Sequence, residues 1–301
     1  MSLIHPQLTA FAAVLDEGSF ERAALRLSLT PSAVSQRIKA LEDRLGQVLV
    51  LRQSPCRATD AGKRLLRSLQ QMRLLEAEAL DDFGMQQHEA PTTTIAIAVN
   101  ADSLATWFLD ALADLHKRHG LLFDVHVEDQ DHSTNLLREG SVLGAVTADA
   151  HPVQGCNVEP LGVMRYLPVA SPQFVERYIG KKLDDHALGT APMLVFNRKD
   201  ELQSRFIRSV TRTRVTPPVH YLPSSTAFVD AAALGLGWAM APETMARERL
   251  ESGALRVLAA RRWLDVPLYW QHWSIRAETL GWVSDALRHT AATKLRKFSM
   301  N

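Results

Sequence analysis

The sequence predicts a chain of two parts, a helical N-terminal part followed by a larger α/β C-terminal part. Three observations support this fold class. Apolar residues recur at helical spacing through roughly the first 80 residues. A polar segment with one proline, QQHEAPTTT at 86–94, then reads as a linker. Beyond it, short β-branched runs alternate with helical patterns, as in folds where helices cover a parallel sheet.

Composition excludes several classes of protein. A chain of 301 residues with 46% hydrophobic residues is long and apolar enough for about two globular domains. The two cysteines, Cys56 and Cys156, are distant and form no CxxC motif, so neither a disulfide framework nor a zinc site is expected. No apolar run of membrane-spanning length and no secretion signal is evident. We therefore expect a cytoplasmic protein without membrane contact, metal or cofactor.

Charge is distributed unevenly along the chain. Of the 34 Lys+Arg and 33 Asp+Glu, residues 1–75 hold 11 and 6, a net of +5, and the remainder holds 23 and 27, a net of −4. A basic head on an acidic body is typical of a protein that meets nucleic acid through one end.

The head begins with three predicted helices. His5 to Asp16 forms the first, and the stretch Phe20 to Arg44 contains two more, separated by a turn at 29–31. Thr30 suits the N-cap of the third helix, and Gly46 closes it. Each of the last two helices has one apolar face, formed by Phe20, Ala23, Ala24 and Leu27 in one and Val34, Ile38, Leu41 and Leu45 in the other.

Burial of these faces leaves a polar face near the start of the third helix. Hydroxyls, an amide and a cation are the groups that bond phosphates and base edges in DNA, and helix N-terminal amides add a phosphate site. The alternative is an ordinary solvated face of a helical hairpin. The candidate DNA-binding residues, including two wing arginines discussed below, are Arg22, Thr30, Pro31, Ser32, Ser35, Gln36, Arg37, Lys39, Arg52 and Arg57.

A wing and a long helix follow. Val48 to Leu51 and the pair Ala58-Thr59 suit a two-stranded wing whose edges carry Arg52 and Arg57. A helix from Thr59 or Asp60 to about Gly84 lacks proline and spans on the order of 39 Å. Its apolar seam predicts either a dimerisation helix, which we favour, or packing on its own body. The seam consists of Leu65, Leu69, Met72, Leu75 and Ala79.

The α/β part divides into two sets of elements. Strands at 95–99, 122–128 and 142–147 alternate with helices at 103–117 and 134–139, which predicts a parallel sheet. A second set starts with 161–170 and continues with strands near 193–196, 219–222 and 237–240 and helices near 172–178, 201–211, 226–236 and 242–251. The last strand, 266–273, and the terminal helix, 278–297, either return to the first set or belong to a second domain in series.

Ligands of open α/β sheets bind at the carboxyl ends of the strands. Ser103 and Thr226 are expected to open helices there and so to hold a carboxylate. Asp102, Glu128 and Asp129 suit a cationic group, with Asp129 preferred, although Asp102 and Ser225 could also serve only as helix caps. The candidate ligand-binding residues are Asn100, Asp102, Ser103, Glu128, Asp129, Thr147, Phe196, Asn197, Ser224, Ser225 and Thr226.

The run GSFERAALRLSLTPSAVSQRIKALEDRLGQVLVLR at 18–52 resembles the winged helix-turn-helix of LysR-type transcriptional regulators. SAVSQRIKALE and the later VNADSLATW are similar to the branch that responds to basic amino acids, the ArgP/LysG group. Many members of that family have glutamine where this chain has Pro31, which leaves the target DNA sequence open.

The resemblance implies an N-terminal all-α winged helix-turn-helix with a long linker helix, and a C-terminal α/β effector domain of two lobes like a periplasmic binding protein. The expected domains are 1–58, 59–91, 92–162 with 266–301, and 163–265, with hinges near Gly162 and Asp265. The implied partners are promoter double-stranded DNA, lysine or arginine as effector, and a second or further copies in a homodimer or homotetramer. The implied role is activation of an amino-acid exporter or related gene.

Three other functions compete with this one. A chromosome-origin-binding replication inhibitor would use the same DNA-binding head. A solute-binding protein would explain the body but not the basic head. An enzyme is not expected, because the sequence contains no GxSxG, no GxGxxG after a strand and no HExxH motif.

Overall fold

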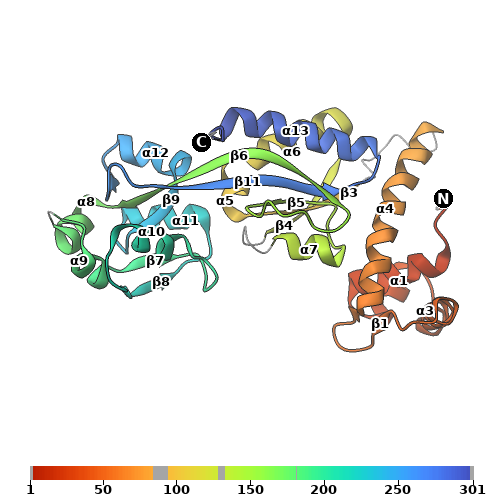
Figure 1. The fold of residues 1–301 in the computed structure, drawn as a ribbon. Helices are drawn as coiled ribbons and strands as arrows, with labels where there is room; N and C mark the ends of the chain where they lie inside the picture. The colour runs from red at the N-terminus through yellow and green to blue at the C-terminus, as the bar shows by residue number, and fades with distance from the viewer. Residues whose placement is uncertain (1–2, 84–93, 128–132, 181, 299–301) are drawn as a thin grey trace.

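The computed structural model describes residues 3–83, 94–127, 133–180 and 182–298. The head is built as the sequence predicts (Figure 1). The Thr30 hydroxyl accepts a hydrogen bond from the Ala33 amide (3.2 Å), and Gly46 ends the third helix at φ 65°, which confirms both caps. The apolar faces close on Phe11 of the first helix. The three helices are α1 (Pro6–Glu17), α2 (Phe20–Arg26) and α3 (Pro31–Leu45).

The wing and the long helix are also present. β1 (Val50–Leu51) and β2 (Arg57–Ala58) pair antiparallel, and α4 (Asp60–Asp82) follows. The residues of the predicted apolar seam of α4 differ in burial. Leu69 is buried in the core of the head, whereas Met72 and Leu75 are 49% and 44% exposed. One side of α4 therefore packs on its own chain and another stays apolar and open.

Contacts at both ends attach α4 to the body. Lys63 pairs with Glu139 (Nζ–Oε1 3.0 Å), and near the other end Glu78 accepts a hydrogen bond from the Thr279 amide (2.8 Å). Between them Leu74 is buried in the core of the body. A side chain at Gly140 would meet the backbone of Arg67 at 2.8 Å, so glycine permits this close approach.

A mixed sheet forms the centre of the body. β3 (Thr94–Val99) pairs parallel with β4 (Leu122–Val127) and β5 (Gly144–Thr147), as predicted. β11 (Leu264–Trp273) then adds antiparallel to β5, so the last strand returns to the first set. The sheet order is β10-β6-β11-β5-β3-β4, with β9 also paired to β6. Helices of this first lobe are α5 (Ala101–Ser103), the π-helical turn η1 (Leu104–Phe108), α6 (Leu109–His119), α7 (Ser133–Glu139) and α13 (Glu278–Lys294).

The second lobe is smaller in sheet and richer in helices. β7 (Met193–Val195) and β8 (Val219–Tyr221) form a parallel pair, whereas β9 (Ala239–Pro242) and β10 (Arg256–Val257) pair with β6 (Cys156–Ala170). The helices are α8 (Pro172–Phe174), the π-helical turn η2 (Val175–Ile179), α9 (Asp185–Thr190), α10 (Leu202–Val210), α11 (Ser225–Ala233) and α12 (Glu243–Glu251).

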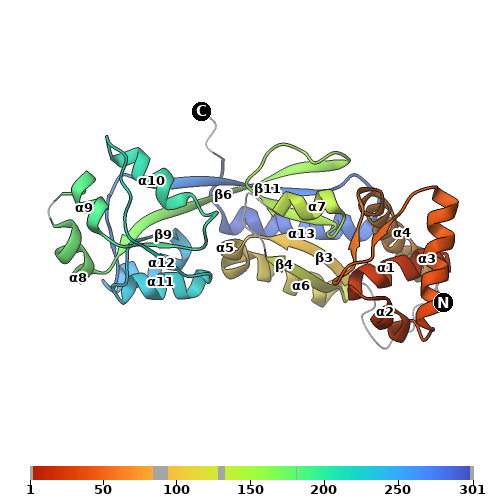
Figure 2. The same ribbon diagram turned by 90° about the horizontal axis from the view of Figure 1, so that it is seen from below.

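Two long strands, β6 and β11, cross from one lobe to the other and are called the crossing strands below (Figures 1 and 2). Their pairing shifts between Leu268 and Tyr269, opposite Gly162, which has φ 150°. A side chain at Gly162 would meet Leu295 at 2.8 Å. Both strands run unbroken through the expected hinge positions, and the domain boundaries stay predictions.

Candidate functional site

The polar face of α3 is open to solvent. Ser32, Gln36 and Lys39 are exposed, and Ser35 is half-buried beside them. Arg52 of the wing reaches this face, since its Nη1 donates to Ser35 Oγ at 3.4 Å and its guanidinium lies 5.0 Å from the centre of the Phe20 ring. The fold therefore places a wing cation beside the start of α3, where phosphate and base-edge contacts are made in helix-turn-helix proteins.

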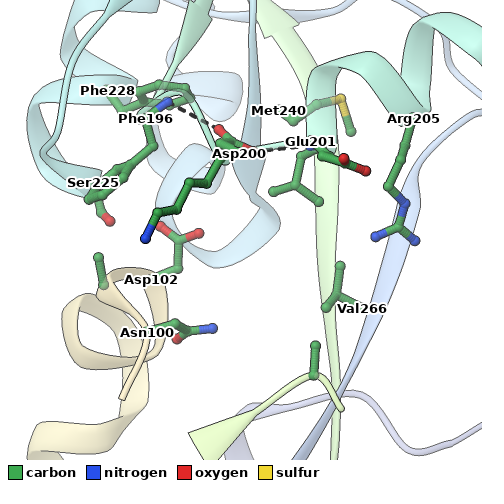
Figure 3. A pocket seen from close by; sticks show the side chains of 14 residues that line it. Asn100, Asp102, Phe196, Asp200, Glu201, Arg205, Ser225, Phe228, Met240 and Val266 are labelled. Atoms are coloured by element: carbon green, nitrogen blue, oxygen red, sulfur yellow. Dashed lines mark hydrogen bonds between the residues drawn. The ribbon is translucent and has the colours of Figure 1, made fainter. Parts of the chain in front are cut away.

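A cleft opens between the two lobes at the carboxyl ends of β3 and β7 (Figure 3). Asn100 and Asp102 reach it from the start of α5, and Ser225 from the start of α11. Glu201 and Arg205 lie together on the opposite side, near Val266 of a crossing strand. The interlobe cleft is lined by Asn100, Ala101, Asp102, Ala148, Phe196, Lys199, Asp200, Glu201, Leu202, Arg205, Ser225, Phe228, Met240 and Val266.

Asp102 is held in this cleft by a crossing strand. The Tyr166 hydroxyl of β6 donates to Asp102 Oδ2 at 2.7 Å. Burial raises the pKa of the Asp102 carboxyl, and the negative charge of Asp200 adds to that rise, while the hydroxyls of Ser225 and Tyr166 oppose it. A cation entering the cleft would therefore favour ionisation of a carboxyl group whose ionised form burial disfavours.

Asp200 is fixed by the backbone of its own loop. Its Oδ2 accepts from the Phe196 amide at 3.1 Å, and its Oδ1 accepts from the Leu202 amide at 3.0 Å. Together with the exposed Glu201, it gives the second lobe two acids in the cleft. Neither acid is among the predicted ligand residues, although the place of Asp200 and Glu201 between a predicted strand end and the start of a predicted helix is a usable signal.

Comparison with known proteins identifies the family. The model of the LysR substrate binding domain matches residues 88–292, and that of the bacterial regulatory helix-turn-helix protein, lysR family, matches residues 5–63. The chain belongs to the LysR family.

Relatives and solved structures agree with this assignment. The chain is 50% identical to the HTH-type transcriptional regulator LysG of Mycobacterium bovis, over 95% of this chain and 93% of that protein. It resembles the crystal structure of ArgP from Mycobacterium tuberculosis with a TM-score of 0.88 at 48% identity, over 98% and 100% of the two chains. It resembles full-length LysG from Corynebacterium glutamicum with bound effector Arg with a TM-score of 0.78 at 39% identity, over 97% and 100%.

In this LysR-type regulator the helix caps differ from those predicted at the cleft. Asn100 Oδ1 accepts from the Ser103 amide (2.7 Å), and Ser224 Oγ accepts from the Ala227 amide (3.4 Å). The prediction that Ser103 and Thr226 open their helices is therefore wrong. The Ser103 hydroxyl is buried and has no hydrogen-bond partner among the described residues.

The remaining predicted ligand residues are spread around the cleft. Phe196 lines it. Thr147 is buried and accepts from the Asp149 amide (3.1 Å), and Asn197 accepts from the Lys199 amide (2.7 Å). Neither residue lines the cleft, nor do Ser224 and Thr226. Glu128 and Asp129 lie outside the described residues.

The remaining predicted DNA-binding residues of the LysR-type head are less uniform. Arg22 and Pro31 are exposed, and Arg37 is half-buried on the flank of α3. Arg57 lines a cavity between the wing, α4 and α7 together with Lys63. Their contact with DNA stays a prediction.

Two further findings concern the described residues. They contain no group of three or more His, Cys, Asp or Glu side chains placed to hold a metal ion. No helix among them is both long enough and apolar enough to span a bilayer.

Proposed function

We propose that this LysR-type regulator binds promoter DNA through α3 and the wing as a homodimer or homotetramer. We further propose that arginine or lysine in the interlobe cleft controls that binding. The protein acts by binding rather than catalysis, in the cytoplasm where its DNA lies. The observation that carries the proposal is the charge of the cleft, which matches a basic amino acid.

The cleft contains three carboxyl groups, those of Asp102, Asp200 and Glu201, and two cations, Lys199 and Arg205. With all five ionised, three negative and two positive charges leave a net of −1. Arginine and lysine carry one carboxylate, one ammonium and one further cation, a net of +1. Each charged group of the ligand can therefore find an opposite charge, which favours a cationic amino acid over a neutral one.

The cleft is lined by charged and polar groups from both lobes. Asp102 and Asn100 belong to the first lobe, and Asp200, Glu201 and Arg205 belong to the second. A ligand bound to groups from both lobes stabilises the arrangement that brings them together. In this proposal Arg205 holds the carboxylate of the amino acid, and Asp102 and the acids of the second lobe hold its two cationic groups.

Calorimetric titration of the full chain tests the effector. Arginine and lysine are compared with citrulline and norleucine, which have similar shapes but lack the side-chain charge. We expect saturable binding of the two cationic amino acids and a loss of at least about tenfold in affinity for the neutral ones, since one charge-assisted contact is absent. Equal binding of arginine and citrulline would refute the role of the acids.

Mobility-shift titration with promoter DNA tests the head. Gln36→Ala and Lys39→Ala are expected to weaken binding, and Lys39→Ala to reduce the slope of log K against log salt by about 0.9 for one lost phosphate contact. Arg44→Ala serves as the matched control, because Arg44 is an exposed cation at the other end of α3. If all three variants bind like the unaltered chain, the assigned face of α3 is wrong.

A further inference from the structure

A second cavity lies between the same two lobes, on the opposite side of the crossing strands from the interlobe cleft. Side chains alternate along β6, so Tyr166 reaches Asp102 in the cleft while Arg165 points to the other face and pairs with Asp265. In Figure 1, α12 and α13 lie above the crossing strands, and α10 and β7 lie below them. This rear cavity, of about 240 Å³, is formed by η1, β6, the first turn of α12 and the end of α13.

The charge of the rear cavity is opposite to that of the cleft. Four of its lining residues are cations, Arg165, Arg247, Lys294 and Arg296, and one, Glu243, is acidic. Three cations have acidic partners. Arg165 bonds both oxygens of Asp265 at 2.8 and 2.7 Å, Lys294 Nζ lies 2.9 Å from Asp110, and Arg296 bonds Glu243 at 2.8 to 3.0 Å.

Arg247 is the exception. It is exposed on α12 and forms no ion pair with any other described residue. Four cations against Glu243, Asp265 and Asp110 leave one positive charge, and that charge lies at the cavity. An exposed arginine is common on protein surfaces. Arg247 differs because it lines a cavity that three other cations also line.

Two further features favour an anion. α12 begins at Glu243 with Pro242 as its N-cap, and no side chain caps its first amides, so N–H groups of its first turn can donate to a ligand beside Thr244. Trp107, Val163 and Leu295 supply an apolar wall. A ligand that matches both features has an anionic oxygen group attached to a small apolar body.

We propose that the rear cavity binds a small organic anion, a carboxylate or a phosphate ester, as a second ligand. Arg247, Lys294 and the first turn of α12 hold the anionic group, and the apolar wall holds the rest. The basic amino acid proposed for the cleft is disfavoured here, because its own net positive charge meets the one positive charge that remains at the rear cavity.

The rear cavity is lined by residues of both lobes, so a ligand in it depends on the relative position of the lobes. Arg296 pairs its backbone with Val163 of β6 (2.8 and 3.0 Å) and extends its guanidinium to Glu243 of the second lobe. An anion competes with Glu243 for these cations and contacts both lobes at once. If the proposed function of the cleft is right, the anion changes the affinity for arginine, and arginine changes the affinity for the anion by the same factor.

Calorimetry on the full chain with phenyl phosphate, benzoate and benzyl alcohol tests the site itself. The three probes share one ring and differ in charge, so we expect phenyl phosphate to bind more tightly than benzoate, and benzyl alcohol to give no saturable heat. Saturation of the cleft with arginine should leave one anion bound per chain. Equal binding of benzyl alcohol, or no saturable binding of phenyl phosphate, overturns the proposal.

Matched variants locate the site. Arg247→Gln and Lys294→Gln should each weaken phenyl phosphate about tenfold, the effect of one lost charge-assisted contact. Arg208→Gln removes an exposed cation from α10, outside the cavity, and should change nothing. Lys39→Ala should also leave anion binding intact, which separates this site from the DNA-binding face. Equal losses in Arg208→Gln or Lys39→Ala would show binding to surface charge in general and refute the site.

Discussion

The polar face of α3 and the interlobe cleft differ in how firmly the chain holds their side chains. On α3, Gln36 and Lys39 are exposed and bond no other described residue. In the cleft, Asp102 is bonded by Tyr166, and Asp200 by two backbone amides. DNA presents many phosphates on a stiff frame and can order mobile side chains, whereas a small ligand has few groups and needs partners already in place.

Asp102→Asn is expected to have the largest effect on the affinity of the cleft for arginine. Loss of the charge removes a cation partner while the amide can still accept from Tyr166. We expect arginine affinity to fall about tenfold to a hundredfold, the range for a hydrogen bond to a charged group. DNA affinity without amino acid should stay unchanged. Calorimetry and mobility shift on the same preparation measure both.

The matched control for that change is Glu248→Gln, which removes an exposed acid from α12 outside the cleft. A similar loss of arginine affinity in both variants would mean that the overall acidity of the body, and not the fixed carboxyl group, attracts the ligand.

A smaller effect is expected from Tyr166→Phe, which keeps the buried ring and removes the hydroxyl that positions Asp102. Loss of one such bond weakens arginine about fivefold, near 1 kcal/mol. It also raises the pKa of Asp102 further, so the weakening should grow as pH falls. Tyr221→Phe is the control, because Tyr221 is 48% exposed and lies outside the cleft. Equal affinities for arginine in the two variants would contradict the comparison, because arginine binding would then not depend on the hydrogen bond that positions Asp102.

The smallest expected effect is on the pH dependence of the free energy of unfolding. Burial raises the pKa of Asp102 above its ordinary 3.8, so the folded chain binds this proton more tightly than the unfolded chain does. The contribution of Asp102 to the free energy of unfolding therefore falls as pH rises through the window above 3.8. Asp102→Asn should stabilise the chain at neutral pH and lose that advantage as pH falls through the same window, measured by urea unfolding.

The affinity for arginine should also depend on pH through the protonation of Asp102. The ligand favours the ionised carboxyl group, so arginine affinity should weaken as pH falls toward the raised pKa of Asp102, and Asp102→Asn should flatten the profile. DNA affinity measured over the same pH range supplies a reference from the other region. A pH profile that is identical in the unaltered chain and the variant would contradict the assignment.

The head could be predicted well from the sequence because its signals are local. Helical spacing, the Thr30 cap and the closing Gly46 each depend on a few neighbouring residues. The cleft could be predicted only in part. The rule that ligands bind at strand ends places Asn100, Asp102, Phe196 and Ser225, all of which line it.

What sequence reasoning missed depends on contacts made after folding. Asp200 turns back to the Phe196 amide only because the loop after β7 closes, and no periodic pattern marks such a loop. The prediction that Ser103 and Thr226 open their helices is wrong because equally good capping residues, Asn100 and Ser224, precede them. The elements α9 and β10 are six and two residues long, too short for a pattern to indicate.

The attachment of α4 to the first lobe limits how a signal can travel. Lys63, Leu74 and Glu78 fasten the helix along its length, and Gly140 lets it lie against the backbone of Arg67. Any movement of the head relative to the lobe that carries Asp102 must therefore break these contacts. In an assembly of several copies, a change in the spacing between the DNA-binding heads that keeps these contacts requires neighbouring copies to tilt against each other.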